Sequence, residues 1–369
     1  MTNKMSNAEI GARNLLINCG KMQTGQKLLI LYEACEHGYF DKDITIIVAQ
    51  AAKALGLDVT MKEVPFIPEV TELSQELRTI MAKADATLFI ARLGDQMRFQ
   101  PSLAKFNPIV SYTLDVYMLS SSFGRADYRA FAELKSQINA LIWGAREIHV
   151  TCPLGTDFRG SLLGEKYLDE DVSVRRFPMS VFKPAPAIGF SGRIAQNGFL
   201  VGTGSSYYSP FACELKDTVF IEFDGNKITD FTGDENAVEK ARSHYKHVSE
   251  LYGIERDYVH SWHAGIHPGI SFNEPASASF ERWSGGAFGS PRILHFHTCG
   301  AYAPGEISLN VLDPTIRIDG AAVWEDGCLY PDRIPLGLEI LEKYPCAKNA
   351  FENPSNAAGI SENGQLSFR

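Results

Sequence analysis

The sequence predicts an α/β N-terminal domain of Rossmann-like type, followed by an α+β C-terminal domain that is rich in antiparallel strands. Three observations predict this division. Strand-like and helix-like segments alternate over residues 1–150, and glycine and proline separate short alternating runs over residues 151–369. The length of 369 residues exceeds what one ordinary core accommodates. We therefore expect two domains, with the functional site in the second.

The expected strands of the first domain are short runs of aliphatic and β-branched residues, at 27–33, 57–64, 86–93, 107–113 and 147–153. Residues 44–56 carry alanines at helical spacing with Gly56 as a C-cap, and residues 131–145 are expected to form a helix that leads into the last strand. Strands separated by helices imply a mostly parallel sheet with helices on both faces.

The second domain is expected to consist mainly of strands, at 197–204, 217–233, 292–300 and 307–320. The Asp-Gly-Asn sequence at 224–226 favours a tight turn, so residues 219–223 should pair with residues 227–231 in an antiparallel hairpin. One helix interrupts the strands, with Asp234 as its N-cap and Gly253 just past its end.

The composition limits the possible partners. The net charge is −9, the isoelectric point is about 5.5, and no lysine or arginine block is present, which argues against a nucleic-acid or anionic-membrane partner. No apolar run approaches the roughly 18 residues that span a bilayer, and the N-terminus lacks the pattern of a signal peptide. The seven cysteines are scattered without a CxxC pair. We expect a cytoplasmic protein that binds a small molecule or another copy of itself.

Five of the nine histidines gather in two short stretches, HSWHAGIHPG at 260–269 and ILHFHTCG at 293–300. His295 and His297 are two residues apart in a strand-like run, so both side chains should lie on one face with Cα atoms about 6.6 Å apart. That spacing lets both imidazoles reach one metal ion. Metal binding and direct catalysis by this pair are both open alternatives, because the sequence alone does not separate them.

The other histidines are less constrained. His263 and His267 are four residues apart, but the glycine and proline between and after them oppose a helix. In an extended chain they would lie about 13 Å apart, so at most one of them should join the His295 and His297 pair. We take His263 as that ligand, and His260, Ser261 and His267 as candidate catalytic residues. For His260 and His267 taken singly, the alternative is an ordinary core or surface position.

A carboxylate is expected to complete the site. Asp313 is the first candidate, because APGE at 303–306 should turn the chain and return residues 310–314 beside the histidine strand. Its alternative is a turn residue of the Asp-Pro type, and weaker candidates are Asp257, Glu274 and Glu281. Two histidines and one carboxylate suit non-haem Fe(II), whereas carboxylate-rich sets suit zinc, manganese or cobalt.

The order of motifs in the second half resembles a known family. TDFRGSLLG, GFLVGTGSSYYSPF and IEFDGNKITDFTG are followed by a helix, LYGI, a G-I-H-P element and a strand-rich end. This order resembles the fold of metallo-aminopeptidases of the aminopeptidase T type and of 2,5-dihydroxypyridine 5,6-dioxygenase. The resemblance covers most of the chain from about residue 145 and, more loosely, the segment before it.

The resemblance implies a ligand set that this chain keeps only in part. A family ligand position falls on Ser261, which His260 and His263 flank. A later His-x-Asp pair of the family reads Val311, Leu312, Asp313, so the aspartate is kept and the histidine is absent. The glutamate-rich element of the peptidases is also missing. We therefore expect a site rebuilt from His263, His295 and His297, with Asp313 retained.

Three functions follow from the resemblance. The first is ring cleavage, in which Fe(II) brings O2 to a hydroxylated pyridine-like or related aromatic ring and a nearby base deprotonates the ring hydroxyl group. The second is amide hydrolysis with one or two divalent ions, as in the aminopeptidases. The third is a metal-free derivative of the fold. The predominance of histidine favours the first, and the family also implies a homodimer.

The substrate pocket should contain aromatic residues that accept a flat ring. Candidates near the histidines are Trp262, Phe272, Trp283, Phe288, Phe296 and Tyr302. Ordinary core positions are the alternative for each of them. Asp157 and Arg159 lie at the expected junction of the domains and are candidates for binding a polar group of the substrate, with a structural ion pair as their alternative.

Overall fold

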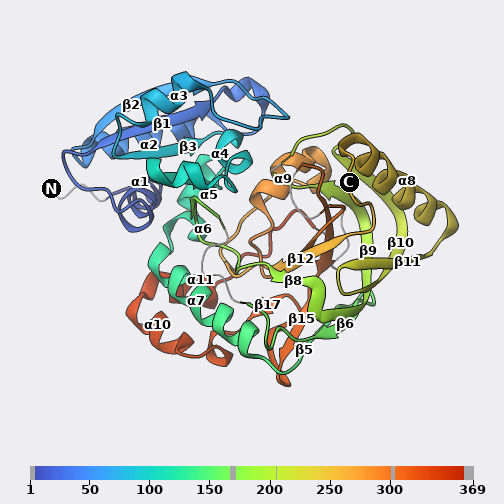
Figure 1. The fold of residues 1–369 in the computed structure, drawn as a ribbon. Coiled ribbons are helices and arrows are strands. Elements are labelled where there is room, and N and C mark those ends of the chain that lie inside the picture. Colours follow the sequence, from blue (N-terminus) through green and yellow to red (C-terminus); the bar gives the residue numbers. More distant parts are fainter. Residues whose placement is uncertain (1–4, 167–171, 205, 301–303, 361–369) are drawn as a thin grey trace.

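The fold consists of two β-sheets with helices between and around them. The computed structural model describes residues 5–166, 172–204, 206–300 and 304–360. One sheet has five parallel strands in the order β2-β1-β3-β4-β7, and the other has twelve strands that pair antiparallel. Figure 1 shows the parallel sheet in blue with α2 and α3, and the antiparallel sheet curving through the green, yellow and orange part of the chain. Tyr302 lies outside the described residues.

The parallel sheet forms where the sequence predicts it. Its strands are β1 (Lys27–Glu33), β2 (Asp58–Val64), β3 (Ala86–Ile90), β4 (Pro108–Ser111) and β7 (Arg175–Phe177). The first four alternate with helices and coincide with predicted strands. The helices of this part are α1 (Asn7–Arg13), α2 (Lys42–Ala54), α3 (Gln75–Met81), α4 (Arg92–Gln96), α5 (Val116–Ser120) and α6 (Ser122–Arg125). A parallel sheet and a large antiparallel sheet in one chain agree with the predicted mixed α/β class.

The antiparallel sheet takes most of the remaining chain. Its strands are β5 (Ile148–Thr151), β6 (Asp157–Gly160), β8 (Ala185–Pro186), β9 (Phe190–Gly202), β10 (Ala212–Asp224), β11 (Lys227–Gly233), β12 (Val259–Ala264), β13 (Ile293–Thr298), β14 (Ile307–Leu312), β15 (Thr315–Ile318), β16 (Ala321–Glu325) and β17 (Cys328–Leu329). The helices are α7 (Tyr128–Gly144), α8 (Glu235–Tyr252), α9 (Phe280–Gly286), α10 (Gly337–Lys343) and α11 (Pro345–Glu352). None of the helices in the described part of the chain is long and apolar enough to cross a bilayer.

The sheets do not divide the chain at residue 150. The strand at 147–153, which we expected in the parallel sheet, forms β5 and pairs antiparallel with β6 and β15. The parallel sheet instead ends with β7, which pairs parallel with β4 although it lies beyond residue 150. The apolar face of α7 belongs to the core of the antiparallel sheet. The prediction failed here because the side-chain pattern of a short strand does not specify which sheet the strand joins.

The local predictions in the second half are confirmed. The Asp234 carboxylate accepts hydrogen bonds from the backbone N–H groups of Asn236 and Ala237, and Gly253 ends α8 in the left-handed region at φ 63°. Strands β10 and β11 form the expected antiparallel hairpin around residues 224–227. Helix α8 packs against this hairpin on one side of the molecule (Figure 1). The hairpin and helix also contact the strands that carry the histidines, since Phe223 packs against Phe296 and the Tyr245 hydroxyl bonds to Thr298.

Strand β13 lies between two hydrophobic cores. All six of its residues are buried. Leu294 and Phe296 point into the core that includes α7 and α8, and Ile293 belongs to the core shared with the parallel sheet. Because strand side chains alternate, His295 and His297 point away from Leu294 and Phe296. The strand therefore places two imidazoles at the boundary between the two halves of the molecule.

Arg92 links the two halves through buried ion pairs. It begins α4 directly after β3, and its guanidinium pairs with Glu33 at the end of β1 at 2.5 Å and with Glu281 of α9 at 2.5 Å. Arg92 and Glu33 are 3% and 4% exposed. The ring of Phe66 lies 3.3 Å from the guanidinium carbon and covers one face of the group. Removing one partner of such a buried ion pair leaves the other charge buried without compensation, which is strongly destabilising.

We predict that Arg92→Met destabilises the fold by about 3–5 kcal/mol, because it leaves the Glu33 carboxylate buried without a cation. Urea titration followed by tryptophan fluorescence measures the loss. The control is Lys62→Met, which removes a partly exposed ion pair with Glu76 and should cost less than about 1 kcal/mol. Equal effects of the two substitutions would contradict the structural role of Arg92.

Candidate metal centre

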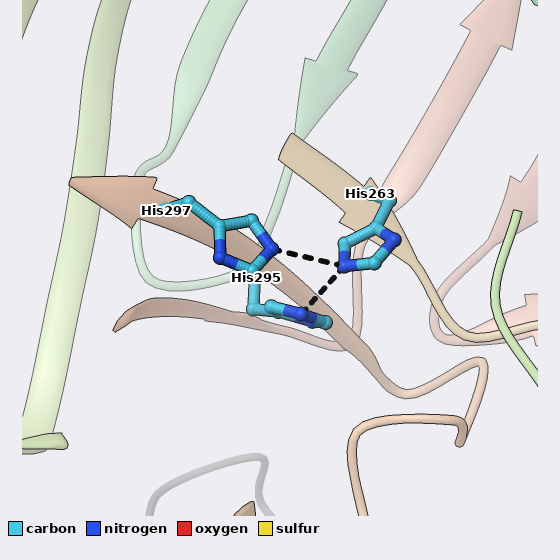
Figure 2. A group of neighbouring side chains, drawn as sticks. All are labelled: His263, His295 and His297. Carbon is cyan, nitrogen blue, oxygen red and sulfur yellow. Dashed lines mark hydrogen bonds between the residues drawn. The ribbon is translucent and has the colours of Figure 1, made fainter. Parts of the chain in front are cut away.

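The register of two strands brings three histidines together. Strands β12 and β13 are antiparallel neighbours in which His263 lies opposite His295, and Ser261 lies opposite His297. Because His295 and His297 share a face of β13, the ring of His263 meets both of them. Figure 2 shows the three rings turned toward one another from the two strands. The expectation that one further histidine joins the H-x-H pair agrees with this geometry.

The three Nε2 atoms converge on one point. His263 Nε2 lies 2.7 Å from His295 Nε2 and 3.2 Å from His297 Nε2. Imidazole nitrogens bound at about 2.0–2.1 Å to one ion would be separated by about 3.0–3.4 Å, depending on coordination number. Each histidine is less than 10% exposed. A small inward or outward adjustment of the rings therefore suffices for one divalent ion to bind at this point.

The opposite ring nitrogens of two of these histidines face oxygen atoms. His263 Nδ1 donates to the carbonyl oxygen of Phe182 at 2.9 Å, and His297 Nδ1 lies 3.2 Å from Oε1 of Glu306. With its proton held on Nδ1, His263 presents the lone pair of Nε2 to the centre of the cluster. Burial and the neighbouring His263 and His297 hold the pKa of His295 well below its ordinary value. Neutral imidazoles with converging lone pairs are the form that binds metal.

Glu306 is the carboxylate that supports this cluster. It is 3% exposed and accepts a hydrogen bond from Thr203 Oγ1 at 2.7 Å in addition to its contact with His297. Burial alone would raise the pKa of this carboxyl group, but His297, Arg98 and Thr203 together lower it well below the ordinary value. Glu306 therefore remains ionised and holds His297 in place as a carboxylate partner of a ligating histidine.

A cavity of about 110 Å³ lies in front of the three histidines. Its first wall contains His263, His295, His297 and Phe288, whose ring stacks on that of His295 at 4.3 Å between centroids. The opposite wall contains side chains that the parallel sheet positions: Asp95, Arg98, Tyr112 and Arg176. The cavity therefore lies between the two sheets.

The second wall forms at the carboxyl ends of parallel strands. Asp95 belongs to α4, which follows β3, and Tyr112 directly follows β4. Tyr112 donates a short hydrogen bond to Asp95 Oδ1, and Arg98 Nη1 donates to Asp95 Oδ2 at 2.8 Å. A Cβ atom at Gly204 would lie 2.1 Å from Asp95 Oδ2, so glycine at this position makes room for the carboxylate. Ligands of open parallel sheets bind at this edge as a rule.

Asp313 is not beside the histidines, contrary to our expectation. It follows β14, and its carboxylate pairs with Arg292 through contacts of 2.7 and 2.8 Å. In the β13–β14 register, Asn310 lies opposite His295, and Asp313 lies beyond the end of the pairing. Asp313 adopts a positive φ of 47°, which fits its alternative as a turn residue. The carboxylate beside the histidines comes instead from the start of the same strand, at Glu306.

The three candidate catalytic residues occupy different places. Ser261 is buried and its hydroxyl lies 2.8 Å from His260 Nδ1, next to His297 across the strand pair. His267 does not line the cavity and is fully buried. Its ring stacks on Phe131 at 3.8 Å between centroids, and its Nδ1 accepts a hydrogen bond from Gly269. Burial lowers the pKa of His267 to about 3, so the ring is neutral in the folded protein.

The expected substrate-binding residues lie outside the cavity. Asp157 contacts His149 at 2.8 Å on β5, and Arg159 is more than half exposed. Trp262 points away from His263 into the aromatic core with Phe158. Of the expected aromatic residues that the structure describes, Phe288 lines the cavity, whereas Phe272 and Phe296 belong to the cores.

Trp283 supports this wall from behind. Its Nε1 donates to the carbonyl oxygen of Ala358 at 2.8 Å, and its ring packs edge-on against Phe288.

Sequence reasoning missed Asp95, Arg98, Tyr112 and Glu306. For Glu306 a signal existed, because the residue before a paired strand must lie near the end of its neighbour. For the other three the only signal is their position after parallel strands.

Comparison with solved structures identifies the fold. The structure of 2,5-dihydroxypyridine dioxygenase from Pseudomonas putida KT2440 matches 89% of this chain and 98% of its own chain, with a TM-score of 0.57 and 15% sequence identity. The chain and this dioxygenase share one fold. The resemblance inferred from the motif order is thus confirmed for the fold.

A second similar structure is that of wild-type AmpT from Thermus thermophilus, with a TM-score of 0.47 and 11% identity. The match covers 85% of this chain and 96% of that chain. No protein-family model and no curated protein sequence matches the chain.

We predict that Glu306→Gln lowers the affinity for a divalent ion about 10- to 100-fold, because the neutral amide no longer fixes and polarises His297. Competition with a chromophoric chelator measures the affinity. His295→Ala/His297→Ala should abolish binding, and His247→Ala, which alters an exposed histidine of α8, should leave it unchanged. Unaltered affinity in both the Glu306 and the double variant would contradict a metal centre here.

We predict that His267 makes the fold sensitive to acid. Between about pH 6.5 and pH 3 the unfolded chain binds a proton at this ring and the folded chain does not, so stability falls as the pH decreases. In His267→Gln the fall should be shallower by up to about 1.4 kcal/mol per pH unit. Urea titrations from pH 8 to pH 4 measure the free energy of unfolding of the variant and of the wild type. Their difference at pH 8 gives the packing cost of the substitution alone. An unchanged slope would contradict this assignment.

Proposed function

We propose that the protein is a metal-dependent oxygenase that opens a small hydroxylated aromatic or pyridine-like ring, with Fe(II) held by His263, His295 and His297. The observation that carries the proposal is the convergence of three Nε2 atoms on the wall of a cavity. The fold shared with a dioxygenase supports the same reaction class. The proposed ligand set keeps the three expected histidines and leaves out Asp313, which pairs with Arg292.

The donor set suits iron. Imidazole binds iron, zinc, copper and nickel, and three ligands on one side of an ion leave positions open on the other side. Those positions would face the cavity, because all three histidines line it. A bound Fe(II) ion supplies redox chemistry with O2 and lowers the pKa of a ring hydroxyl group that coordinates it.

The protein's own groups would orient the ring and receive its proton. Phe288 provides a flat surface beside His295, on which an aromatic ring can stack. Asp95 lines the same cavity and is held by Arg98 and Tyr112, so it is placed to accept the proton of a ring hydroxyl. The buried walls exclude bulk water from the reacting ring.

Hydrolysis of an amide is the second candidate. Three histidines, one of which contacts a carboxylate through Nδ1, also form the centre of zinc enzymes that activate water. His297 and Glu306 make such a pair. Zinc, manganese or cobalt would then bind in place of iron, and Asp95 would act on water rather than on the ring.

We predict that the protein, purified without air and loaded with Fe(II), consumes O2 when 2,5-dihydroxypyridine or hydroquinone is added. An oxygen electrode measures the rate, and His263→Ala should lower it at least about 100-fold, since one ligand is lost. His247→Ala is the matched control. Hydrolysis of aminoacyl anilides by zinc-loaded protein, without O2 consumption by the iron form, would favour the second candidate instead.

A further inference from the structure

Two arginines form part of the cavity wall that faces the histidines. The charged side chains that line the cavity within the described residues are Asp95, Arg98 and Arg176. Tyr112 lies in the same wall, and the charges of Arg98 and Arg176 both act on its hydroxyl group.

The guanidinium of Arg98 has unused hydrogen-bond donors. Arg98 is 7% exposed, and its Nη1 donates to the backbone and side-chain oxygens of Asp95 at 3.0 and 2.8 Å. Among the described residues no acceptor lies within hydrogen-bonding distance of its Nε or Nη2. The ring of Phe99 packs against the group at 4.4 Å and holds its plane. A buried guanidinium with free N–H groups is a site for a planar oxyanion.

A divalent ion held by the three histidines would place positive charge opposite Arg98 and Arg176. The volume of about 110 Å³ is of the same order as the roughly 150 Å³ engineered cavity that binds benzene. The space therefore suits one ring with small polar substituents.

We propose that Arg98 and Arg176 form a carboxylate subsite, so that the substrate is a hydroxylated single-ring carboxylate whose ring faces the three histidines. The inference rests on the proposed function for the orientation of the ring. Arg98 donates through Nε and Nη2 to the carboxylate, and Arg176 of β7 lies in the same cavity wall. Asp95 fixes Arg98 and is itself fixed by Tyr112, so the subsite is assembled before the substrate arrives.

The test compares two probes that differ by one carboxylate, 2,5-dihydroxybenzoate and hydroquinone. Calorimetric titration without O2 measures their binding to the full-length protein as purified, so turnover does not enter the readout. The wild type should bind 2,5-dihydroxybenzoate about 10- to 100-fold more tightly, the difference expected for charge-assisted hydrogen bonds. Equal binding of the two probes would overturn the subsite.

Arginine variants test which side chains produce the preference for 2,5-dihydroxybenzoate over hydroquinone. Arg176→Gln and Arg98→Gln should each lower the preference at least about fivefold, and Arg98→Lys should retain part of it because the charge remains. Arg146→Gln, an exposed arginine outside the cavity, is the matched control and should retain all of it. If Arg98→Gln does not fold, Arg176→Gln and Arg98→Lys carry the test. A preference that survives in both Arg176→Gln and Arg98→Lys without loss overturns the proposal.

Failure of the subsite and failure of the proposed function give different results. A preference that survives the arginine variants but disappears in His295→Ala/His297→Ala places the carboxylate on the histidines and overturns the subsite. A preference that depends on the arginines, in a protein that binds no iron or consumes no O2, supports the subsite and contradicts the oxygenase. Metal analysis of each variant accompanies the titrations.

Discussion

The convergence of three Nε2 lone pairs in a buried position is the constraint on which the rest of the site depends. Lone pairs at hydrogen-bonding distance repel one another unless a proton or a cation lies between them. The sheet imposes this arrangement, because the β12–β13 register places His263 opposite His295. The Phe182 carbonyl oxygen and Glu306 then prevent the rings of His263 and His297 from turning away. In the structure, hydrogen bonds join His263 Nε2 to the Nε2 atoms of His295 and His297, and a divalent ion would take the place of the shared protons.

The two sheets contribute different parts of the site. The antiparallel sheet provides rigid neighbouring strands, which suit ligands that must keep fixed mutual distances. The parallel sheet provides the loops and short helices after its strands, where Asp95, Arg98 and Tyr112 form a hydrogen-bonded group. Arg92 joins these parts through Glu33 and Glu281. The geometry of the cavity therefore depends on a polar contact between the halves, and not only on packing within each half.

Local patterns in the sequence predicted local features well. The caps of α8, the hairpin of β10 and β11, and the shared face of His295 and His297 depend only on residues close in sequence. Asp313 and His267 failed because their surroundings depend on distant partners, Arg292 in one case and Phe131 in the other. Glu306 depends on how strands pair, and Arg98 on how two sheets meet. A single sequence carries little signal for such long-range arrangements.

The position of β7 has a further consequence. The chain leaves the parallel sheet after β4, builds β5 and β6 of the antiparallel sheet, returns to add β7, and leaves again for β8. A gene fragment that ended near residue 150 would encode a parallel sheet without its edge strand and an antiparallel strand without neighbours. Recombination could therefore not exchange either half as an independent module. The three histidines of the antiparallel sheet and the cavity wall that the parallel sheet positions would have to be inherited together, and the cavity would change by substitution of its lining residues rather than by domain shuffling.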